Sequence, residues 1–180
     1  MPDLAHGIAL RGATPADAAA IAAVQAASWR TTYGGILPAA VIERETGRKT
    51  EAMWRQWLAP RQGGVATIVA ERAGEGVVGF INCGPARRPI EGLEAEVYAL
   101  YVLREHQRVG VGRELVRASA RHFVRQGLFG FYLWVLKANA AQLFYEALGG
   151  ERVAEKTEDL GGHVVSELAY AWHDLTALVE

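Results

Sequence analysis

Residues 96–126, EVYALYVLREHQRVGVGRELVRASARHFVRQ, combine an apolar run, two closely spaced glycines and a long helical pattern. The run 96–102 is typical of a buried strand, and the pattern over 110–126 predicts a helix that Gly127 ends. Glycines between a strand and a helix let backbone N–H groups approach an anion closely, and the helix dipole adds positive potential there. The stretch therefore predicts a binding site for a phosphate or pyrophosphate group.

Two familiar phosphate-binding motifs do not fit this turn. A dinucleotide-binding fingerprint requires a third glycine where Leu115 stands, and an acidic residue about 20 positions later, which residues 129–138 lack. A P-loop requires Gly-Lys-Ser/Thr, but Arg113 and Glu114 follow the second glycine. A tight Gly-x-Gly connection without any ligand stays open as the plain alternative.

The charge of the chain favours a small anionic ligand over a polyanion. The 180 residues carry a formal net charge of -1 and are 51% hydrophobic, which disfavours disorder and bulk nucleic-acid binding. Residues 103–126 nevertheless hold six arginines against two glutamates. Arg117, Arg121 and Arg125 repeat at helical spacing and are interpreted as a solvated helix face. Arg108 and Arg113 lie beside the glycines, and we expect them to contact the phosphates.

The segments around this stretch predict one domain over residues 1–180. Strands are expected at 8–11, 65–71, 77–83, 95–103, 129–136, 151–158 and 163–172, and helices at 14–33, 39–58, 110–126 and 140–148. Pro85 and Pro89 are expected to bound an irregular link, and the second helical stretch to break near Gly47. The order predicts an α/β (α+β) fold, with a mixed, mostly antiparallel central sheet of about seven strands and helices on both faces.

Several other chemistries find no support in the residues. Cys83 is alone, which excludes an internal disulfide and a cysteine-based zinc site, and it is interpreted as a small buried apolar residue. The five histidines show no paired spacing for a metal, and His106 is expected at the surface. No apolar stretch approaches the ~20 residues of a membrane span. Residues 1–7 do not resemble a signal peptide, so the protein is expected in the cytoplasm.

Two groups of residues carry a family resemblance. Gln107-x-x-Gly110-x-Gly112 resembles the pyrophosphate-binding motif of the GCN5-related N-acetyltransferases, which use acetyl-coenzyme A. The residues that resemble the second motif of this family are Asn139, Ala141, Phe144, Tyr145 and Gly149. The order of strands and helices matches too, so the resemblance covers nearly the whole chain and implies the acyl-CoA N-acyltransferase fold. One departure is that Phe144 follows Asn139 by five residues, where the commonest pattern has six.

The resemblance implies acetyl-coenzyme A as co-substrate, without a metal. The residues expected to contact it are Leu100, Tyr101, Val102, Gln107, Arg108, Val109, Gly110, Val111, Gly112, Arg113, Asn139 and Tyr145. A backbone N–H within 100–102 would polarise the thioester carbonyl, which requires a locally unpaired N–H such as a bulge or splayed strand supplies.

Acetyl transfer to an amine also needs a base and an acid. Glu96 lies eleven residues before Gln107, at the offset of the family's catalytic glutamate, and is expected to act as base through a water. Its alternatives are a glutamate exposed at the strand end or one paired with an arginine; Glu91 and Glu94 compete for the role. Tyr145 is expected to protonate the leaving thiolate, with aromatic packing as the alternative.

The residues expected on the acceptor side come from the N-terminal helices. Trp29 and Tyr33 are expected to bind the acceptor, whereas Trp54 and Trp57 are interpreted as core. Trp134 is interpreted as sheet core or a subunit contact, which leaves a homodimer open. The expected function is acetyl transfer from acetyl-coenzyme A to the primary amine of a small molecule, in a ternary complex and without nucleic-acid or membrane partners. Acetylation of a protein N-terminal or lysine amine, and a non-catalytic coenzyme A-binding module, stay open.

Overall fold

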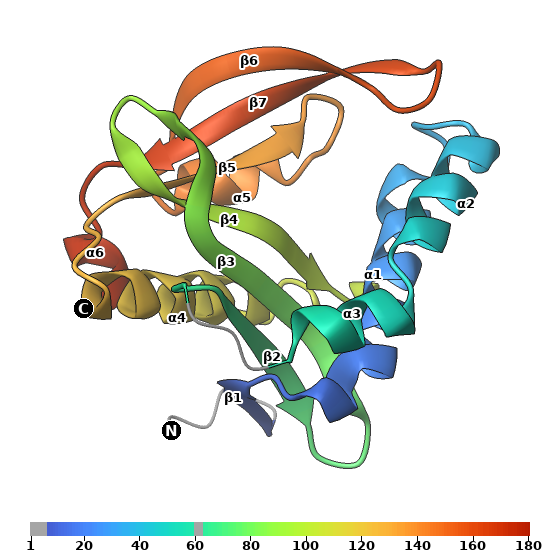
Figure 1. Ribbon diagram of the computed structural model, residues 1–180, viewed down its shortest axis with the longest axis horizontal. Helices are drawn as coiled ribbons and strands as arrows, with labels where there is room; N and C mark the ends of the chain where they lie inside the picture. The colour runs from blue at the N-terminus through green and yellow to red at the C-terminus, as the bar shows by residue number, and fades with distance from the viewer. Residues whose placement is uncertain (1–6, 60–62) are drawn as a thin grey trace.

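A computed structural model describes residues 7–59 and 63–180, which form a seven-stranded sheet with helices against it (Figure 1). The strands are β1 (Ile8–Gly12), β2 (Ala66–Arg72), β3 (Gly76–Ile90), β4 (Leu93–Val102), β5 (Phe131–Leu136), β6 (Glu151–Asp159) and β7 (Val164–Trp172). Their order across the sheet is β1-β2-β3-β4-β5-β7-β6, and only β4 and β5 are parallel. The predicted mixed, mostly antiparallel sheet is confirmed.

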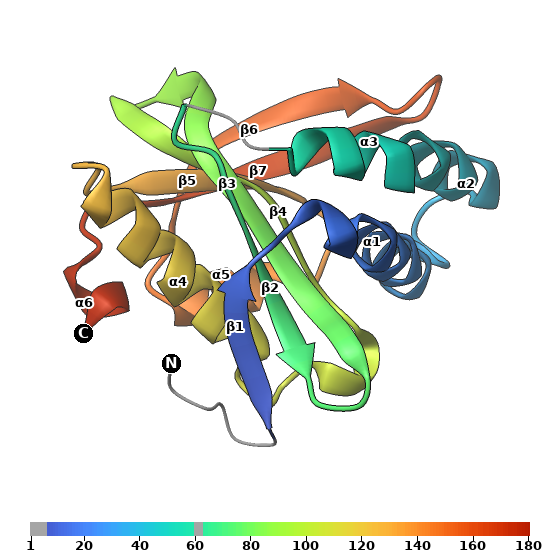
Figure 2. The same ribbon diagram turned by 60° about the horizontal axis from the view of Figure 1, so that its bottom comes forward.

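Helices cover both faces of this sheet, as predicted (Figure 2). On one face lie α1 (Ala18–Tyr33), α2 (Ala39–Arg48) and α3 (Glu51–Trp57), and on the other lie α4 (Val111–Arg125), α5 (Gln142–Ala147) and α6 (Thr176–Val179). Leu115 and Phe123 of α4 are buried in one core cluster with β5 and β7, and Ile21 and Trp54 are buried with Phe80 on the opposite face. Each such side chain stabilises the fold by about 1.5–3 kcal/mol. Within the described ranges, no helix is long and apolar enough to cross a membrane.

The first helix starts at a network of polar groups. A 3₁₀ turn, η1 (Pro15–Asp17), leads into α1. The Asp17 carboxylate accepts the Thr14 N–H at 2.7 Å and two hydrogen bonds from Arg11, both at 2.8 Å. Arg11 also donates to Glu71 of β2 at 2.7 Å, which ties the start of α1 to the sheet.

The link expected between Pro85 and Pro89 is instead the far end of β3. The strand runs to Ile90 and turns at Glu91 and Gly92, which have φ values of 50° and 79°. Prolines are tolerated here because the β2 ladder ends at Cys83 and the register with β4 jumps after Pro85, so their missing N–H groups leave no ladder bond unmade.

The second helical stretch breaks later than expected, at Lys49 and Thr50 rather than near Gly47. The Thr50 hydroxyl accepts the Met53 N–H at 3.3 Å and so starts α3 as its cap. Trp57 is 40% exposed and lies beneath the Lys49 ammonium, so its assignment to the core was wrong.

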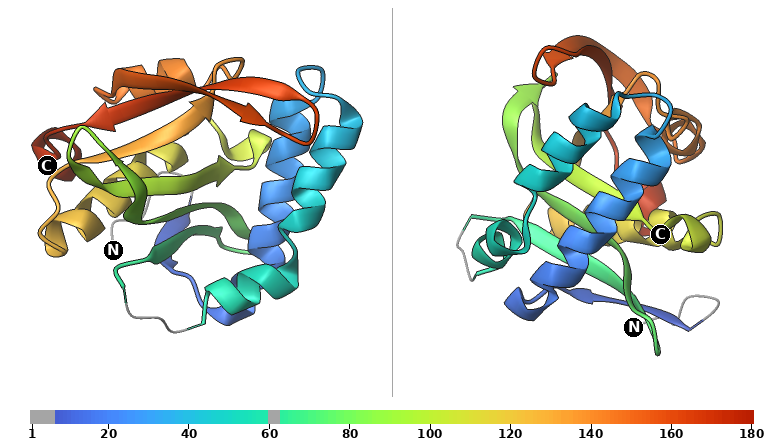
Figure 3. Two further views of the ribbon diagram at one scale, coloured as in Figure 1. Left: turned by 45° about the horizontal axis from the view of Figure 1, so that its top comes forward. Right: turned by 90° about the vertical axis from the view of Figure 1, so that its right-hand side faces the viewer.

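The β6–β7 hairpin reaches across to the ends of α1 and α2 (Figure 3). Arg44 of α2 donates hydrogen bonds to the carbonyl oxygens of Leu160 and Gly161 in the hairpin turn. A buried cluster in the same place joins Tyr33 of α1 to Leu136 of β5, with Val165 of β7 against it. The beginning of β7 is thereby held beside the end of α1.

Candidate active site

The parallel strands β4 and β5 pair only where they begin. Glu96 lies opposite Tyr132 and Val97 opposite Leu133, and the pairing ends there although β4 continues to Val102. A bulge in β4 lies at the same point, because Tyr98 is an extra residue in the register with β3. Since bulges bend a strand and increase its twist, the two strands diverge beyond this point.

The diverging edge of β4 carries backbone N–H groups. Leu103 N–H donates to the Val78 carbonyl of β3 at 2.9 Å. Because antiparallel residues alternate, Tyr101 also directs its N–H to β3, whereas Leu100 and Val102 direct theirs toward β5. Over this described stretch the β5 register includes neither residue. Unpaired N–H groups therefore occur within the predicted segment 100–102.

The glycine turn begins α4 as the sequence predicts. Gly110 caps the helix with a φ of 93°, and Arg108 also has a positive φ, of 62°. A Cβ on Gly112 would lie 3.2 Å from the Phe144 ring, so this glycine lets α5 pack closely on α4. The N–H groups of the first helical turn lack partners within the helix and are available to an anion.

Three arginines that are close to this helix start in the sequence are exposed. They are Arg104, Arg108 and Arg113, and in the part of the chain that the structure describes no carboxylate is paired with them. Arg117, farther along α4, pairs instead with Glu114 at 3.3 Å. Arg104 is one of the six arginines counted in residues 103–126, but it was not among the residues expected to contact the phosphates. Unpaired guanidinium groups beside free N–H groups suit a polyphosphate.

His106 and Gln107, which precede the glycines, hold the turn in place. The Gln107 side-chain amide donates to the Val102 carbonyl at 2.9 Å and so ties the turn back to the end of β4. His106 is buried, and its Nε2 lies 2.9 Å from a Glu75 oxygen. The expected exposure of His106 was therefore wrong, because the β2–β3 turn folds over it. The predicted coenzyme contacts of Gln107 stay a prediction.

Tyr145 presents an unpartnered hydroxyl. The residue is 7% exposed, and its ring centroid lies 6.1 Å from that of Tyr170 and 6.2 Å from that of Trp172. Burial raises the pKa of Tyr145, so the phenol keeps its proton at neutral pH. No described group bonds to its hydroxyl, and in the described ranges Ser28 Oγ is the sole fully buried side-chain nitrogen or oxygen without a hydrogen-bond partner. The Tyr145 oxygen therefore keeps contact with solvent and has a proton to donate.

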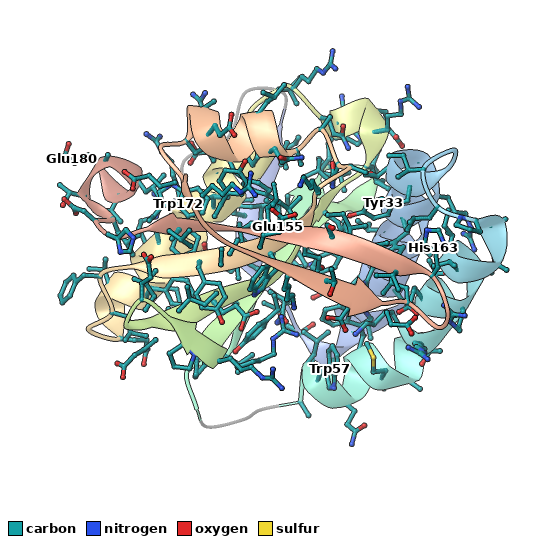
Figure 4. All side chains as sticks on the ribbon, turned by 90° about the horizontal axis from the view of Figure 1, so that it is seen from above. Tyr33, Trp57, Glu155, His163, Trp172 and Glu180 are labelled. Atoms are coloured by element: carbon teal, nitrogen blue, oxygen red, sulfur yellow. The ribbon has the colours of Figure 1, made fainter. Side chains whose placement is uncertain are left out.

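The residues predicted on the acceptor side lie around Tyr145. Trp29 Nε1 donates to the Tyr101 hydroxyl at 2.9 Å, and Asn139 Nδ2 donates to the Tyr33 hydroxyl at 3.2 Å. Burial raises the pKa of Tyr33, and the nearby phenols of Tyr101 and Tyr145 raise it further. Side chains from α1, β4, α5 and the loop between β5 and α5 are thus grouped together, and Figure 4 labels one of them, Tyr33.

Asn139 already has partners within the protein. Besides donating to Tyr33, its side-chain oxygen accepts the Ala141 N–H at 2.9 Å, at the start of α5. The sequence does not predict the bond between Asn139 and Tyr33, nor a role for the Tyr101 hydroxyl, since only the backbone of Tyr101 is expected to contribute. Strand alternation places Tyr101 on the α1 face, but no local signal indicates that Trp29 is its partner.

Glu96 lies on the central strand as predicted. Of the arrangements considered for it, the structure shows the one in which the glutamate is paired with an arginine, Arg87. The Glu96 side chain is 1% exposed. Oε2 accepts the Arg87 N–H at 2.9 Å and the Tyr132 hydroxyl at 3.0 Å, and Oε1 accepts Arg87 Nε at 3.1 Å and a second guanidinium nitrogen. Each oxygen therefore already has two donors, and the role of Glu96 as base stays a prediction.

The described residues contain no candidate metal site. Among residues 7–59 and 63–180, His, Cys, Asp and Glu side chains form no group of three that could hold a metal ion. Cys83 is buried, as predicted, and burial raises the pKa of its thiol to about 12.

Solved structures share this architecture. PaiA N-acetyltransferase from Thermoplasma acidophilum, in complex with coenzyme A, superposes with a TM-score of 0.70 at 21% identity, covering 92% of this chain and 99% of that one. YncA from Salmonella typhimurium, with acetyl-CoA, gives a TM-score of 0.62 at 23% identity and covers 92% of each chain. This chain therefore has the acyl-CoA N-acyltransferase fold, and its open sheet contains one parallel pair of strands that diverges.

Sequence comparisons identify the family within that fold. The model of the acetyltransferase (GNAT) family matches residues 24–149. YuaI of Bacillus subtilis (strain 168), an uncharacterized N-acetyltransferase, is 34% identical over 171 residues, covering 95% of this chain and 96% of the relative. Mycothiol acetyltransferase of Kocuria rhizophila is 36% identical over 118 residues, covering 60% of this chain and 37% of the relative. The chain belongs to the GNAT family of acetyltransferases.

Proposed function

We propose that this protein transfers the acetyl group of acetyl-coenzyme A to the primary amine of a small molecule, in a ternary complex. The observation that carries the proposal is the divergence of β4 from β5 between the start of α4 and the unpartnered hydroxyl of Tyr145. The divergence leaves backbone donors of β4 unpaired, and the start of α4, with its arginines, packs against α5, the helix of Tyr145, through Gly112 and Phe144. The similar structures with coenzyme A or acetyl-CoA support the choice of co-substrate.

The donors on the protein fit a coenzyme A molecule. The guanidinium groups of Arg104, Arg108 and Arg113, with the free N–H groups of the first α4 turn, suit its phosphates. The open edge of β4 suits its amide-containing arm, because an extended chain can hydrogen-bond to an unpaired strand edge. When bound, acetyl-coenzyme A supplies an acetyl thioester.

Each residue then has a defined task. The N–H of Leu100 or Val102 donates a hydrogen bond to the carbonyl oxygen, where negative charge develops as the amine nitrogen bonds to the carbon. Tyr145 gives its proton to the sulfur as the carbon–sulfur bond breaks. Glu96 is the base that the resemblance implies. Since Arg87 and Tyr132 occupy its oxygens, proton uptake through a water requires one of these donors to give way.

A ligand-dependent melting experiment tests the coenzyme site. Acetyl-coenzyme A at 100 times its Kd should stabilise the protein by about 2.7 kcal/mol, a rise in Tm of about 5–10 °C for a chain of this size. The double variant Arg108→Gln/Arg113→Gln should need about tenfold more ligand for the same rise. Arg125→Gln, at the far end of α4, is the matched control and should behave as wild type.

Release of free thiol tests the transfer itself. It should increase when propylamine is added and not when a peptide with a free N-terminal amine is added. No rise in Tm at millimolar acetyl-coenzyme A would overturn the coenzyme assignment. Thiol release that no amine accelerates would overturn the proposal that the protein transfers acetyl to an amine.

A further inference from the structure

Glu167 lies on the acceptor face of the sheet, although no sequence motif contains it. It is directly opposite Leu136 in the antiparallel pair of β5 and β7. Side chains of directly opposite residues share one face, and Leu136 packs against Tyr33 of α1. Glu167 therefore lies on the face that carries Tyr33 and Tyr101, not on the face covered by α4.

One oxygen of Glu167 is occupied, by Lys156. Lys156 lies directly opposite on β6, with its ammonium 3.1 Å from Oε2 of Glu167, 3.6 Å from Glu158 and 4.5 Å from the centre of the Trp134 ring. No other donor among the described residues contacts Glu167, whose side chain is 21% exposed. Glu167 therefore has a single donor among the described residues, whereas Glu96 has four.

The charge of Glu167 acts on the residues around the proposed reaction centre. Burial is the largest cause of the raised pKa of both Tyr33 and Tyr101, and the Glu167 carboxylate raises both further. These phenols belong to the same group of side chains as Tyr145. An ammonium group placed there would meet negative potential together with aromatic rings, which favour cations.

We propose that Glu167 binds the ammonium group of the acceptor, so that the site selects cationic primary amines over zwitterionic ones. The inference rests on the proposed function and names its substrate class. Glu167 suits the role better than Glu96, because all four hydrogen-bonding positions of Glu96 are filled by Arg87 and Tyr132. A zwitterion such as a free amino acid would bring its own carboxylate toward Glu167, and the two like charges would repel.

Calorimetric titration of the coenzyme A-saturated protein with glycinamide and glycine tests this selection. The two probes have nearly the same size, but only glycine carries a carboxylate. Wild type should bind glycinamide at least about tenfold more tightly than glycine. Glu167→Gln should weaken glycinamide binding about tenfold and abolish the preference. Glu158→Gln, which removes the other carboxylate of the same lysine, is the matched control and should retain both values.

Lys156→Met should change glycinamide binding in the direction opposite to Glu167→Gln. It keeps the inference testable if the Glu167→Gln protein does not fold. Because it removes the internal counter-ion of Glu167, it should tighten glycinamide binding, which a merely structural role would not do. The inference is overturned if Glu167→Gln keeps the wild-type preference, if Glu158→Gln loses as much, or if wild type binds glycine as tightly as glycinamide. The acetyl-coenzyme A shift in Tm is measured on the same samples. Its absence in wild type refutes the proposed function, whereas its presence with an unchanged Glu167→Gln refutes only this inference.

Discussion

Replacing Tyr145 by phenylalanine should separate catalysis from stability. The hydroxyl has no partner among the described residues, so its removal leaves no buried group unsatisfied. The phenyl ring keeps its contacts with the rings of Phe144, Tyr170 and Trp172. The free energy of unfolding should therefore change by no more than about 0.5 kcal/mol.

The same change should remove the proton donor of the proposed reaction. Burial raises the pKa of Tyr145, so wild type carries the proton throughout the neutral range. Loss of a positioned proton donor lowers kcat by about 100-fold or more, which corresponds to about 2.7 kcal/mol in the activation barrier. The binding of acetyl-coenzyme A should stay as in wild type, because the hydroxyl would act on the sulfur only as its bond to carbon breaks.

Tyr170→Phe is the matched control for this experiment. Tyr170 lies beside Tyr145, but its hydroxyl donates to Glu146 at 2.7 Å. Its removal should cost about 1 kcal/mol of stability and leave turnover unchanged. Urea denaturation gives the stabilities, and thiol release at saturating substrates gives kcat. A Tyr145→Phe protein with wild-type kcat, or one that loses activity only in proportion to its stability, would refute the reasoning.

Two further substitutions test polar clusters. Glu96→Gln should lower the free energy of unfolding by about 1–3 kcal/mol, because Arg87 and Tyr132 lose a charged acceptor. As the proposed base, Glu96 should also be needed for turnover, so the variant should lose about 100-fold in kcat together with the acid limb of the pH profile; a loss of less than about tenfold would show instead that Glu96 has only a structural role. Asp17→Asn should cost about 1–2 kcal/mol at pH 7, because hydrogen bonds from Arg11 lower the pKa of Asp17 to about 2 from 3.8. This contribution is fully present above about pH 5 and is largely lost as the pH falls to about 2, so urea denaturation curves that keep a constant separation across that interval would contradict it.

Much of the fold could be predicted from local signals. Alternating apolar residues and glycine turns located every strand, and Gly110 and Gly127 bound α4 in the structure as they do in the sequence. Errors arose where the tertiary surroundings of a segment outweigh its local preference. Pro85 and Pro89 would normally end a strand, but β3 continues through them because no ladder bond is needed there.

The candidate site also has one part that local sequence predicts and one part that depends on tertiary contacts. The proposed phosphate-binding half of the site is contiguous in sequence, so the order of residues alone brings Arg108, Gly110, Gly112 and Arg113 together. The acceptor half comes from separate segments. Glu167 belongs to no motif, and its place beside Tyr33 depends on the register of β7 against β5.

Local sequence is enough to set the class of fold, the glycine turn and its positive charge, because helix starts and strand alternation are short-range properties of the chain. The tertiary structure alone decided which polar groups are free to react. It filled the oxygens of Glu96 with Arg87 and Tyr132, and it left the Tyr145 hydroxyl open. The physical reason is that hydrogen-bond partners are chosen by which strands pair and where they diverge, and the pairing of β4 with β5 ends after two residue pairs.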